Sequence, residues 1–196
     1  MANYISDRAF TNHIHTNIAT PKVYEPINWV QELLDPANAL HIDMFDGIDY
    51  VFSKDGITKT VQERFRERKY ERYSDFTIRY RRDNNEHPER HKSEYFKMKA
   101  DYFTYGITNC LKNDLPLCTD FIKFAIIDLR LVYAHIDCGD IVILDNGKSL
   151  CKIINHKIEC PIKYNTDGSS SFFPIEIAFL IELWGKEIIV AQKGFV

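Results

Sequence analysis

Residues 47–67 contain the pattern that most restricts the fold, because two strand-forming runs there flank a tight-turn sequence. The first run, GIDYVF, leads into Ser53-Lys54-Asp55-Gly56, and the chain resumes as ITKTVQERFRE. Asp-Gly between two such runs is typical of a β-hairpin. The segment therefore predicts two adjacent antiparallel strands, around which the rest of the chain must build a sheet.

The sequence before the hairpin predicts helical structure. Apolar residues recur at helical spacing over residues 27–34, and Asp35-Pro36 ends the pattern. This predicts a short amphipathic helix that carries Glu32. Residues 1–20 carry little signal, and we expect them to form an N-terminal arm or a short helix.

The segments after the hairpin alternate between strand and loop patterns. Alternating apolar and polar residues over 74–83 predict a third strand, and the polar residues 83–94 predict a loop. Residues 99–108 are rich in aromatic side chains. Their period fits either a strand or the start of a helix.

The C-terminal part of the chain alternates strand and helix patterns. FIKFAII predicts a buried strand, and DLRLVYAHID predicts a short helix closed by Cys138-Gly139. IVILDNGKS and KIINHKIECPIKY predict further strands. SSSFFPIEIAFLIELW predicts a last helix, with serine caps, Pro174 near its start and Gly185 just past its end.

This order of elements predicts a single α/β domain over residues 1–196, with strands and a helix in 137–196. We expect three layers, α/β/α, with a mixed central sheet. A hydrophobic share of 45% is enough for one buried core. No apolar run is long enough to span a bilayer, and the N-terminus has no apolar signal segment. We therefore expect a cytoplasmic protein without a membrane partner.

The cysteines show no spacing that is typical of a disulfide scaffold. There are five of them, Cys110, Cys118, Cys138, Cys151 and Cys160. We expect reduced thiols in a reducing compartment. A zinc site from Cys138, Cys151, His156 and Cys160 is a minor alternative, since no CxxC pair is present.

Basic residues are concentrated in the middle of the chain. Residues 59–99 contain 13 Lys and Arg against 8 Asp and Glu, whereas the whole chain has a net charge of -3. A basic segment inside an acidic protein indicates a local surface for a polyanion. A solvated face of mixed charge explains the composition equally well.

The hairpin also places a candidate catalytic set at one point. Gln62 and Arg64 project from the same face of the second strand, whereas Glu63 projects from the other face. Adjacent strands lie about 4.8 Å apart, so Asp49 in the first strand can share one end of the face with Gln62 and Arg64. A carboxylate, an amide oxygen and a cation then converge.

Such a set suits the hydrolysis of a phosphodiester. Oxygen ligands hold Mg²⁺ with several waters retained, and a cation offsets the charge of the transition state. Glu32 can supply one more oxygen. Taken singly, each residue has a simpler explanation: Asp49 as an acid beside a turn, and Gln62 and Arg64 as the solvent face of an edge strand.

In this order and spacing, the residues resemble the PD-(D/E)XK nuclease superfamily, in the branch where glutamine replaces the second acid. Val61-Gln62-Glu63-Arg64 matches its VQxK strand, and SEYFKMKADYFTYGI resembles a segment that follows the third strand in several phage and restriction nucleases. The resemblance covers about residues 26–136 and implies a restriction-endonuclease-like fold.

The resemblance also implies roles for single residues. Asp49 takes the place of the metal-binding aspartate, Gln62 the second position and Arg64 the place of the catalytic lysine. Glu32 matches a helix carboxylate, and Glu63 restores an acid if a bulge shifts the register. Arginine stabilises phosphate charge but does not deprotonate, and glutamine binds metals more weakly than glutamate.

The function expected from this resemblance is that of a restriction- or phage-type DNA endonuclease. It would use Mg²⁺, with Mn²⁺ as a substitute, and would act as a homodimer when both strands are cut. The basic residues expected to contact phosphates are Arg66, Arg68, Lys69, Arg79, Arg81, Arg82, Lys97 and Lys99.

Two alternatives remain open. One is a nucleic-acid-binding module that keeps the fold but does not cleave, and the other is a protein-interaction domain of the immunity or inhibitor type. The chain has no GxxxxGK[ST], GxGxxG, HExxH or GxSxG motif. Kinase, dinucleotide-oxidoreductase, zinc-protease and serine-hydrolase functions therefore lose their simplest support.

Overall fold

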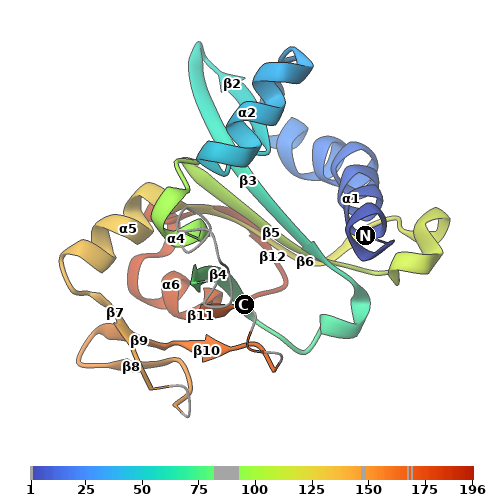
Figure 1. Ribbon diagram of the computed structural model, residues 1–196. Coiled ribbons are helices and arrows are strands. Elements are labelled where there is room, and N and C mark those ends of the chain that lie inside the picture. The colour runs from blue at the N-terminus through green and yellow to red at the C-terminus, as the bar shows by residue number, and fades with distance from the viewer. Residues whose placement is uncertain (1, 82–92, 147–148, 167, 169) are drawn as a thin grey trace.

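The computed structural model describes residues 2–81, 93–146, 149–166, 168 and 170–196, and a six-stranded sheet lies at its centre (Figure 1). In spatial order the strands are β1 (Val30–Gln31), β2 (Tyr50–Lys54), β3 (Ile57–Arg66), β5 (Tyr102–Thr108), β6 (Phe121–Asp128) and β12 (Ile189–Lys193). β3 and β5 are parallel, and the other neighbours are antiparallel. The prediction of an α/β fold with a mixed sheet is confirmed.

The predicted hairpin is the β2–β3 pair. Lys54 lies opposite Ile57, and the two turn residues Asp55 and Gly56 have φ values of 53° and 75°. Positive φ at both central residues is the condition for a type I′ turn, which asparagine, aspartate and glycine satisfy best. The Asp-Gly sequence therefore fixes the register, with Tyr50 opposite Val61.

Two smaller sheets complete the strand structure. One has the order β10-β11-β4, from Lys163–Tyr164, Ser171–Glu176 and Asp75–Arg81. The other has the order β7-β9-β8, from Ile141–Leu144, Lys157–Pro161 and Lys152–Ile154. The third strand predicted from alternation is thus present as β4, but it pairs with β11 instead of with the hairpin.

Several helices surround the sheets. The α-helices are α1 (Ala2–Ile14), α2 (Pro36–Asp46), α4 (Glu94–Lys97), α5 (Leu129–Asp137) and α6 (Ile177–Trp184). A π-helical segment, η1 (His15–Tyr24), continues α1. The short 3-10 segments are η2 (Glu25–Ile27), η3 (Arg68–Tyr70), η4 (Lys112–Leu117) and η5 (Gly185–Glu187).

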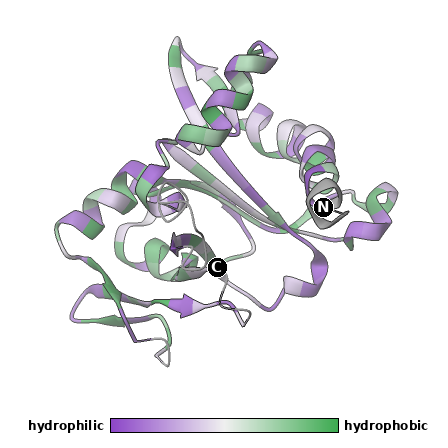
Figure 2. Cartoon of the chain, in the orientation of Figure 1, coloured by the Kyte–Doolittle hydropathy of each residue, from purple (hydrophilic) through white to green (hydrophobic). Residues whose placement is uncertain are grey.

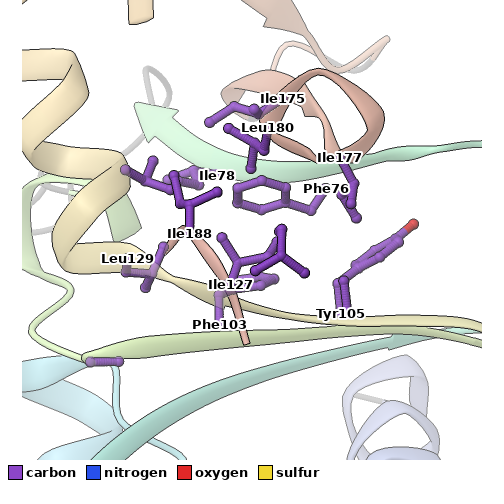
Figure 3. Close-up of a cluster of buried hydrophobic side chains, with 14 of the residues drawn as sticks. Phe76, Ile78, Phe103, Tyr105, Ile127, Leu129, Ile175, Ile177, Leu180 and Ile188 are labelled. Atoms are coloured by element: carbon purple, nitrogen blue, oxygen red, sulfur yellow. The ribbon is translucent and has the colours of Figure 1, made fainter. Parts of the chain in front are cut away.

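One face of the central sheet packs against α5, α6 and the β4–β11 strands. Figure 3 shows this core, in which Phe103 and Ile127 of the sheet meet Phe76 of β4 and Leu180 of α6. These side chains are fully buried. This outer layer contains strands as well as helices, so the predicted α/β/α layering is correct on one side of the sheet and incomplete on the other.

The other face of the sheet is covered by α1 and η1, which lie on the opposite side from α5 and α6 in Figure 1. Phe10, Ile14 and Ile18, spaced four residues apart, pack onto Phe52 and other side chains of this face. Of the two alternatives expected for the N-terminal segment, an arm or a short helix, the structure therefore has the helix, and an apolar stripe packs it onto the sheet.

The helix predicted over residues 27–34 is wrong. Residues 30–31 form the strand β1, with Val30 opposite Ser53, and Leu33 is 95% exposed. Asp35 accepts hydrogen bonds from the backbone N–H groups of Ala37 and Asn38. Asp-Pro therefore begins the next helix, α2, as N-cap and first helical residue, instead of ending an earlier one.

The last predicted helix starts later than expected. Residues 171–176 form β11, with Pro174 opposite Thr77, and α6 begins at Ile177. On the side of β11 away from β4, the described strand β10 pairs only with Ser171 and Phe172. Pro174 therefore has no strand partner on that side, and its missing N–H group leaves no ladder hydrogen bond unmade. The end of the helix at Gly185 is as predicted.

Other predictions from local patterns are confirmed. FIKFAII lies in β6, DLRLVYAHID gives α5 with Cys138 as its C-cap, and residues 99–108 contain the strand β5. All seven residues of β5 are buried, since both faces of the sheet are covered there. For this reason its apolar period could not separate strand from helix. Most of the predicted loop over residues 83–94 lies outside the described residues, namely residues 83–92.

The expectation of reduced thiols throughout is wrong. Cys110 and Cys118 form a disulfide across the connection from β5 to β6, with their Cα atoms 5.0 Å apart. The antiparallel pairing of the two strands brings both ends of this connection together, which spacing in the sequence did not reveal. Cys138, Cys151 and Cys160 are free.

None of the helices in the described ranges is both long enough and apolar enough to cross a bilayer.

The close contact between Gly106 in β5 and Phe121 in β6 gives a first prediction. A Cβ atom on Gly106 would lie 2.7 Å from Cδ1 of Phe121, whose ring is buried against Phe65. We expect Gly106→Ala to lower the free energy of unfolding by about 1–3 kcal/mol, because the ring has no room to move. Urea unfolding measures this, with the exposed Thr58→Ala as control. Equal stability of Gly106→Ala and wild type would contradict the packing described here.

Candidate active-site cleft

A cleft of about 910 Å³ lies between the N-terminal helix, α2 and the start of the β2–β3 hairpin. Asp49, Tyr50, Gln62 and Glu63 come from the hairpin, and α1 and α2 provide the walls. Figure 2 shows a hydrophilic stretch along β3, which is unusual for a strand in the middle of a sheet. Polar groups placed there need either partners or a function.

Asp49 and Gln62 meet as the sequence predicted. Oδ2 of Asp49 accepts hydrogen bonds from Nε2 of Gln62 at 2.6 Å and from the backbone N–H of Glu63 at 2.7 Å. The N–H of Asp49 donates to the carbonyl of Val61 at 2.9 Å, which fixes the carboxylate beside β3. The hairpin register therefore builds this contact.

Two oxygen atoms of this pair remain without a partner. Among the described residues, no hydrogen bond reaches Oδ1 of Asp49 or Oε1 of Gln62. Side-chain N and O atoms of the described residues that are both sealed and unpartnered occur only at Thr20, Ser93 and Ser171. Both oxygens therefore keep some exposure to solvent, and the two residues that carry them line the cleft.

Burial raises the pKa of Asp49 to about 7. The hydrogen bond from Glu63 N opposes this rise, and the negative charge of the Glu63 carboxylate adds to it. The cleft thus contains a carboxyl group that water and neighbouring charges stabilise poorly in its ionised form. Such groups occur at functional sites more often than elsewhere.

Glu63 points to the other face of β3, as alternation predicts, and is held by the N-terminal helix. Nδ1 of His15 lies 3.0 Å from both of its carboxylate oxygens, and the hydroxyl of Tyr24 donates to Oε1 at 2.6 Å. Tyr50 stacks on the His15 ring with centroids 3.4 Å apart. Burial alone would lower the pKa of His15. The hydrogen bond and the negative charge of Glu63 raise it, so that the net shift of the His15 pKa is upward.

Sequence reasoning missed the partners of Glu63. His15 lies in a polar stretch, and its sequence neighbours gave no reason to connect it to β3. Its place four residues before the buried Ala19 and one after Ile14 was the available signal, since it puts His15 near the buried helix face. Gln31, which lies 3.1 Å from His15 Nε2, was missed as well.

Glu32 does not join the cleft in the described structure. It follows the short strand β1, is exposed and is not among the lining residues, whereas its neighbour Gln31 is. The helix that was expected to direct Glu32 toward Asp49 is absent from residues 27–34.

Arg64 shares a face with Gln62 but contacts other groups. Its guanidinium binds Oε1 of Glu94 at 2.5 Å and the carbonyl of Thr77 at 2.6 Å. Arg79 also contacts Glu94, at 3.4 Å, and Arg66 contacts Oγ1 of Thr77 at 3.3 Å. Arg64 is therefore half-buried in an ion-pair cluster on the far side of β3 and does not line the cleft.

Two of the predicted phosphate contacts lie far from the cleft. Arg68 and Lys69 belong to η3, next to the disulfide, and face Glu71 and Glu67 at 4.0 Å and 2.6 Å. Paired surface cations of this kind bind polyanions less readily than free ones, because a carboxylate competes for them.

The remaining predicted contacts are placed separately. Lys97 donates to a backbone carbonyl at the end of α2, and Lys99 pairs with Asp46 at 2.7 Å. Arg81 is exposed at the end of β4 and stacks on a neighbouring tyrosine ring. Arg82 lies outside the described residues. The described basic residues thus form several groups and not one continuous patch at the cleft.

The minor zinc alternative is wrong for the described residues. Cys151 and Cys160 lie with sulfur atoms 3.8 Å apart, and His156 is exposed in the β8–β9 turn. Cys138 lies apart from them, beside His135 and Asp140.

Comparison with family models, with curated proteins and with solved structures gave no match. The resemblance to PD-(D/E)XK nucleases therefore rests on the residues of this chain alone.

The Glu94 cluster yields a prediction about pH. Burial on its own would raise the pKa of Glu94, but Arg64 and Arg79 overcome this and hold it at about 2. Because the folded pKa lies below the ordinary value of 4.5, the ionised carboxylate stabilises the fold above about pH 4.5. That contribution is lost as the pH falls from 4.5 toward 2. We expect Glu94→Gln to cost about 2–4 kcal/mol at pH 7 and much less near pH 3.

Urea unfolding at both pH values measures the effect. Glu71→Gln, which removes only an exposed pair with Arg68, serves as the control and should change stability by less than about 0.5 kcal/mol. A difference between wild type and Glu94→Gln that stays constant from pH 7 to pH 3 would show that the ion pairs do not depress the pKa.

Proposed function

We propose that this protein is a metal-dependent DNA endonuclease with a restriction-endonuclease-like arrangement around the β2–β3 hairpin. The observation that carries the proposal is the pair of unpartnered oxygens, Asp49 Oδ1 and Gln62 Oε1, on the wall of the cleft. The hairpin and its parallel neighbour β5 support the arrangement, because the proposed family places its acidic residues on such strands.

The donor set fits Mg²⁺, with Mn²⁺ as a substitute. Mg²⁺ is commonly bound by one or two protein oxygens, with waters and substrate phosphates as its other ligands. Asp49 and Gln62 would hold the ion. When bound, it supplies Lewis-acid polarisation of a phosphate and a more acidic water.

The residues of the chain prepare this site. The backbone N–H of Glu63 and the amide of Gln62 orient Oδ2 of Asp49, which leaves Oδ1 directed elsewhere. Glu63 is fixed in turn by His15 and Tyr24, so the strand that carries the donors cannot rotate. Rigid support of this kind keeps ligand atoms in position.

A DNA-binding module that does not cleave is the second candidate, and the position of Arg64 favours it. The proposed lysine equivalent is occupied by Glu94 and Thr77, so its contacts give no support to a role in offsetting transition-state charge. A homodimer remains part of the nuclease proposal, because one cleft per chain can cut only one strand at a time.

A cytoplasmic location also stays a prediction. The Cys110–Cys118 disulfide argues against it, because disulfides are rare in reducing compartments.

Cleavage of supercoiled plasmid with Mg²⁺, Mn²⁺ or EDTA tests the enzymatic proposal. We expect nicking with either metal, none with EDTA, and at least an approximately 100-fold loss in Asp49→Asn, since the metal contributes several kcal/mol to the transition state. Asparagine keeps an acceptor for Gln62 and Glu63, so the fold is retained.

Asp43→Asn is the matched control, because Asp43 lines the same cleft but is not bound to Gln62 or Glu63. It should keep activity within about tenfold of wild type. Plasmid that stays intact with both metals would exclude the nuclease, and equal loss in both variants would show that Asp49 has no special role.

Binding of DNA in increasing salt tests both candidates. Removing Arg79, Arg81 and Arg82 together should lower the slope of log K against log salt by about 2–3, since each lost phosphate contact lowers it by about 0.9. Alanine at Lys152 and Lys186, outside the basic segment, should leave the slope unchanged. Wild-type protein that does not bind DNA at low salt would instead favour the protein-interaction alternative.

A further inference from the structure

Three side chains with metal-binding chemistry meet at the C-terminal end of α5. Oδ2 of Asp140 lies 3.1 Å from Nδ1 of His135 and 3.2 Å from Sγ of Cys138. The possible ligand atoms of all three side chains lie within 4.8 Å of one another. Cys138 is exposed, and the other two are half-buried, so solvent reaches the group.

The backbone, and not only the side chains, creates this meeting. The N–H of Cys138 donates to Ala134 at 3.0 Å, and the N–H of Asp140 donates back to the carbonyl of His135 at 2.8 Å. Gly139, with φ of 81°, makes the reversal between them. The helix cap therefore returns Asp140 to the imidazole one turn earlier.

Strand β9 holds the group from the other side. The carbonyl of Asp140 accepts a hydrogen bond from the N–H of Ile158 in β9 at 2.8 Å, and Nζ of Lys157 donates to the carbonyl of Gly139 at 2.8 Å. Trp184 stacks on His135 with ring centroids 3.9 Å apart. The three donors thus sit on a cap that is fixed at both ends.

Two of the three separations are close to those of a coordination tetrahedron, and the third is within 4.8 Å. With bond lengths of about 2.3 Å to sulfur and 2.0–2.1 Å to nitrogen and oxygen, neighbouring ligands of zinc lie about 3.3–3.6 Å apart. The observed 3.1 Å and 3.2 Å require shifts of only a few tenths of an ångström. Thiolate and imidazole together favour zinc over the hard cations Mg²⁺ and Ca²⁺.

We propose that His135, Cys138 and Asp140 form a Zn²⁺ site with three protein ligands and one open position. Binding releases the thiol proton of Cys138 to solvent and moves the imidazole proton of His135 from Nδ1 to Nε2, and Zn²⁺ takes the place of the two hydrogen bonds to Asp140. One thiolate and one carboxylate balance the charge of the ion. Lys157 stays on the Gly139 carbonyl, where it orients the loop without occupying a ligand.

This site is separate from the cleft and does not depend on the proposed nuclease activity. Three protein ligands with a fourth position open are the pattern of zinc sites that bind a water or an external ligand. The site therefore would take a small anionic or thiol ligand at the surface, once the metal is bound.

Titration of the full chain with Co²⁺, followed by Zn²⁺, tests the proposal. The protein is first stripped with a chelator, and a thiol assay confirms that three cysteines are free, so that the Cys110–Cys118 disulfide is intact. We expect one Co²⁺ per chain with a thiolate-to-cobalt charge-transfer band, displaced by Zn²⁺. Cobalt in the Asp49 cleft would give no such band, because no thiol lines it.

Variants separate this site from the other thiols. Cys138→Ser should lose the band, and His135→Gln and Asp140→Asn should weaken binding at least about tenfold, since even outer partners of a metal contribute that much. The control Cys151→Ser with Cys160→Ser should keep the band. Wild-type protein without the band, a band that survives in Cys138→Ser, or one that is lost in the control would each overturn the proposal. Thermal melting of each variant confirms that it is folded.

Discussion

The side chain of Glu63 is fully buried in the middle of the central sheet, and the N-terminal part of the fold is arranged around it. A buried carboxylate without partners would destabilise the protein by several kcal/mol. His15 and Tyr24 supply those partners, and both come from the helical segment that covers this face. The same residue gives its backbone N–H to Asp49. The packing of the N-terminal helical segment and the placement of Asp49 in the cleft therefore both depend on Glu63.

β3 carries ionic side chains on both faces, which fixes its register more firmly than apolar packing alone. Glu63 is matched to His15 on one side, and Arg64 is matched to Glu94 on the other. A slip by one residue in one direction would place Arg64 beside His15 and Phe65 beside Glu94, and a slip in the other would place Gln62 beside His15 and Glu63 beside Glu94. Either slip breaks both buried pairs, so the alternative registers are excluded by charge as well as by shape.

Local signals in the sequence predicted the parts of the fold that are locally determined. The Asp55-Gly56 turn, the end of α5 and the end of α6 at Gly185 follow from backbone preferences of one or two residues. The contact between Asp49 and Gln62 follows from the hairpin register. Pairings between distant segments did not follow, because His15 reaches Glu63 across 48 residues and Glu94 reaches Arg64 across 30.

The failed predictions share a physical cause. Residues 27–34 have helical spacing, but Val30, Leu33 and Leu34 of the predicted apolar stripe are exposed. The Asp35 cap starts a helix in the next segment instead. Pro174 looked like a helix start, yet it lies in a strand where no donor is needed. In each case the local pattern is present in the sequence, but packing against neighbouring elements determined the secondary structure.

The charges of the cleft bear directly on the choice between nuclease and binder. Asp7, Asp43, Asp49 and Glu63 line it, against the cations of Arg8 and His15. Arg8 is already paired with Asp43, and His15 with Glu63. A phosphate would thus meet net negative potential unless a metal ion entered first. The basic residues of 59–99 do not remove this barrier, because those placed in the structure lie outside the cleft and many are paired with acids. The proposed chemistry therefore depends on a cation at Asp49, whereas binding of DNA elsewhere on the surface does not.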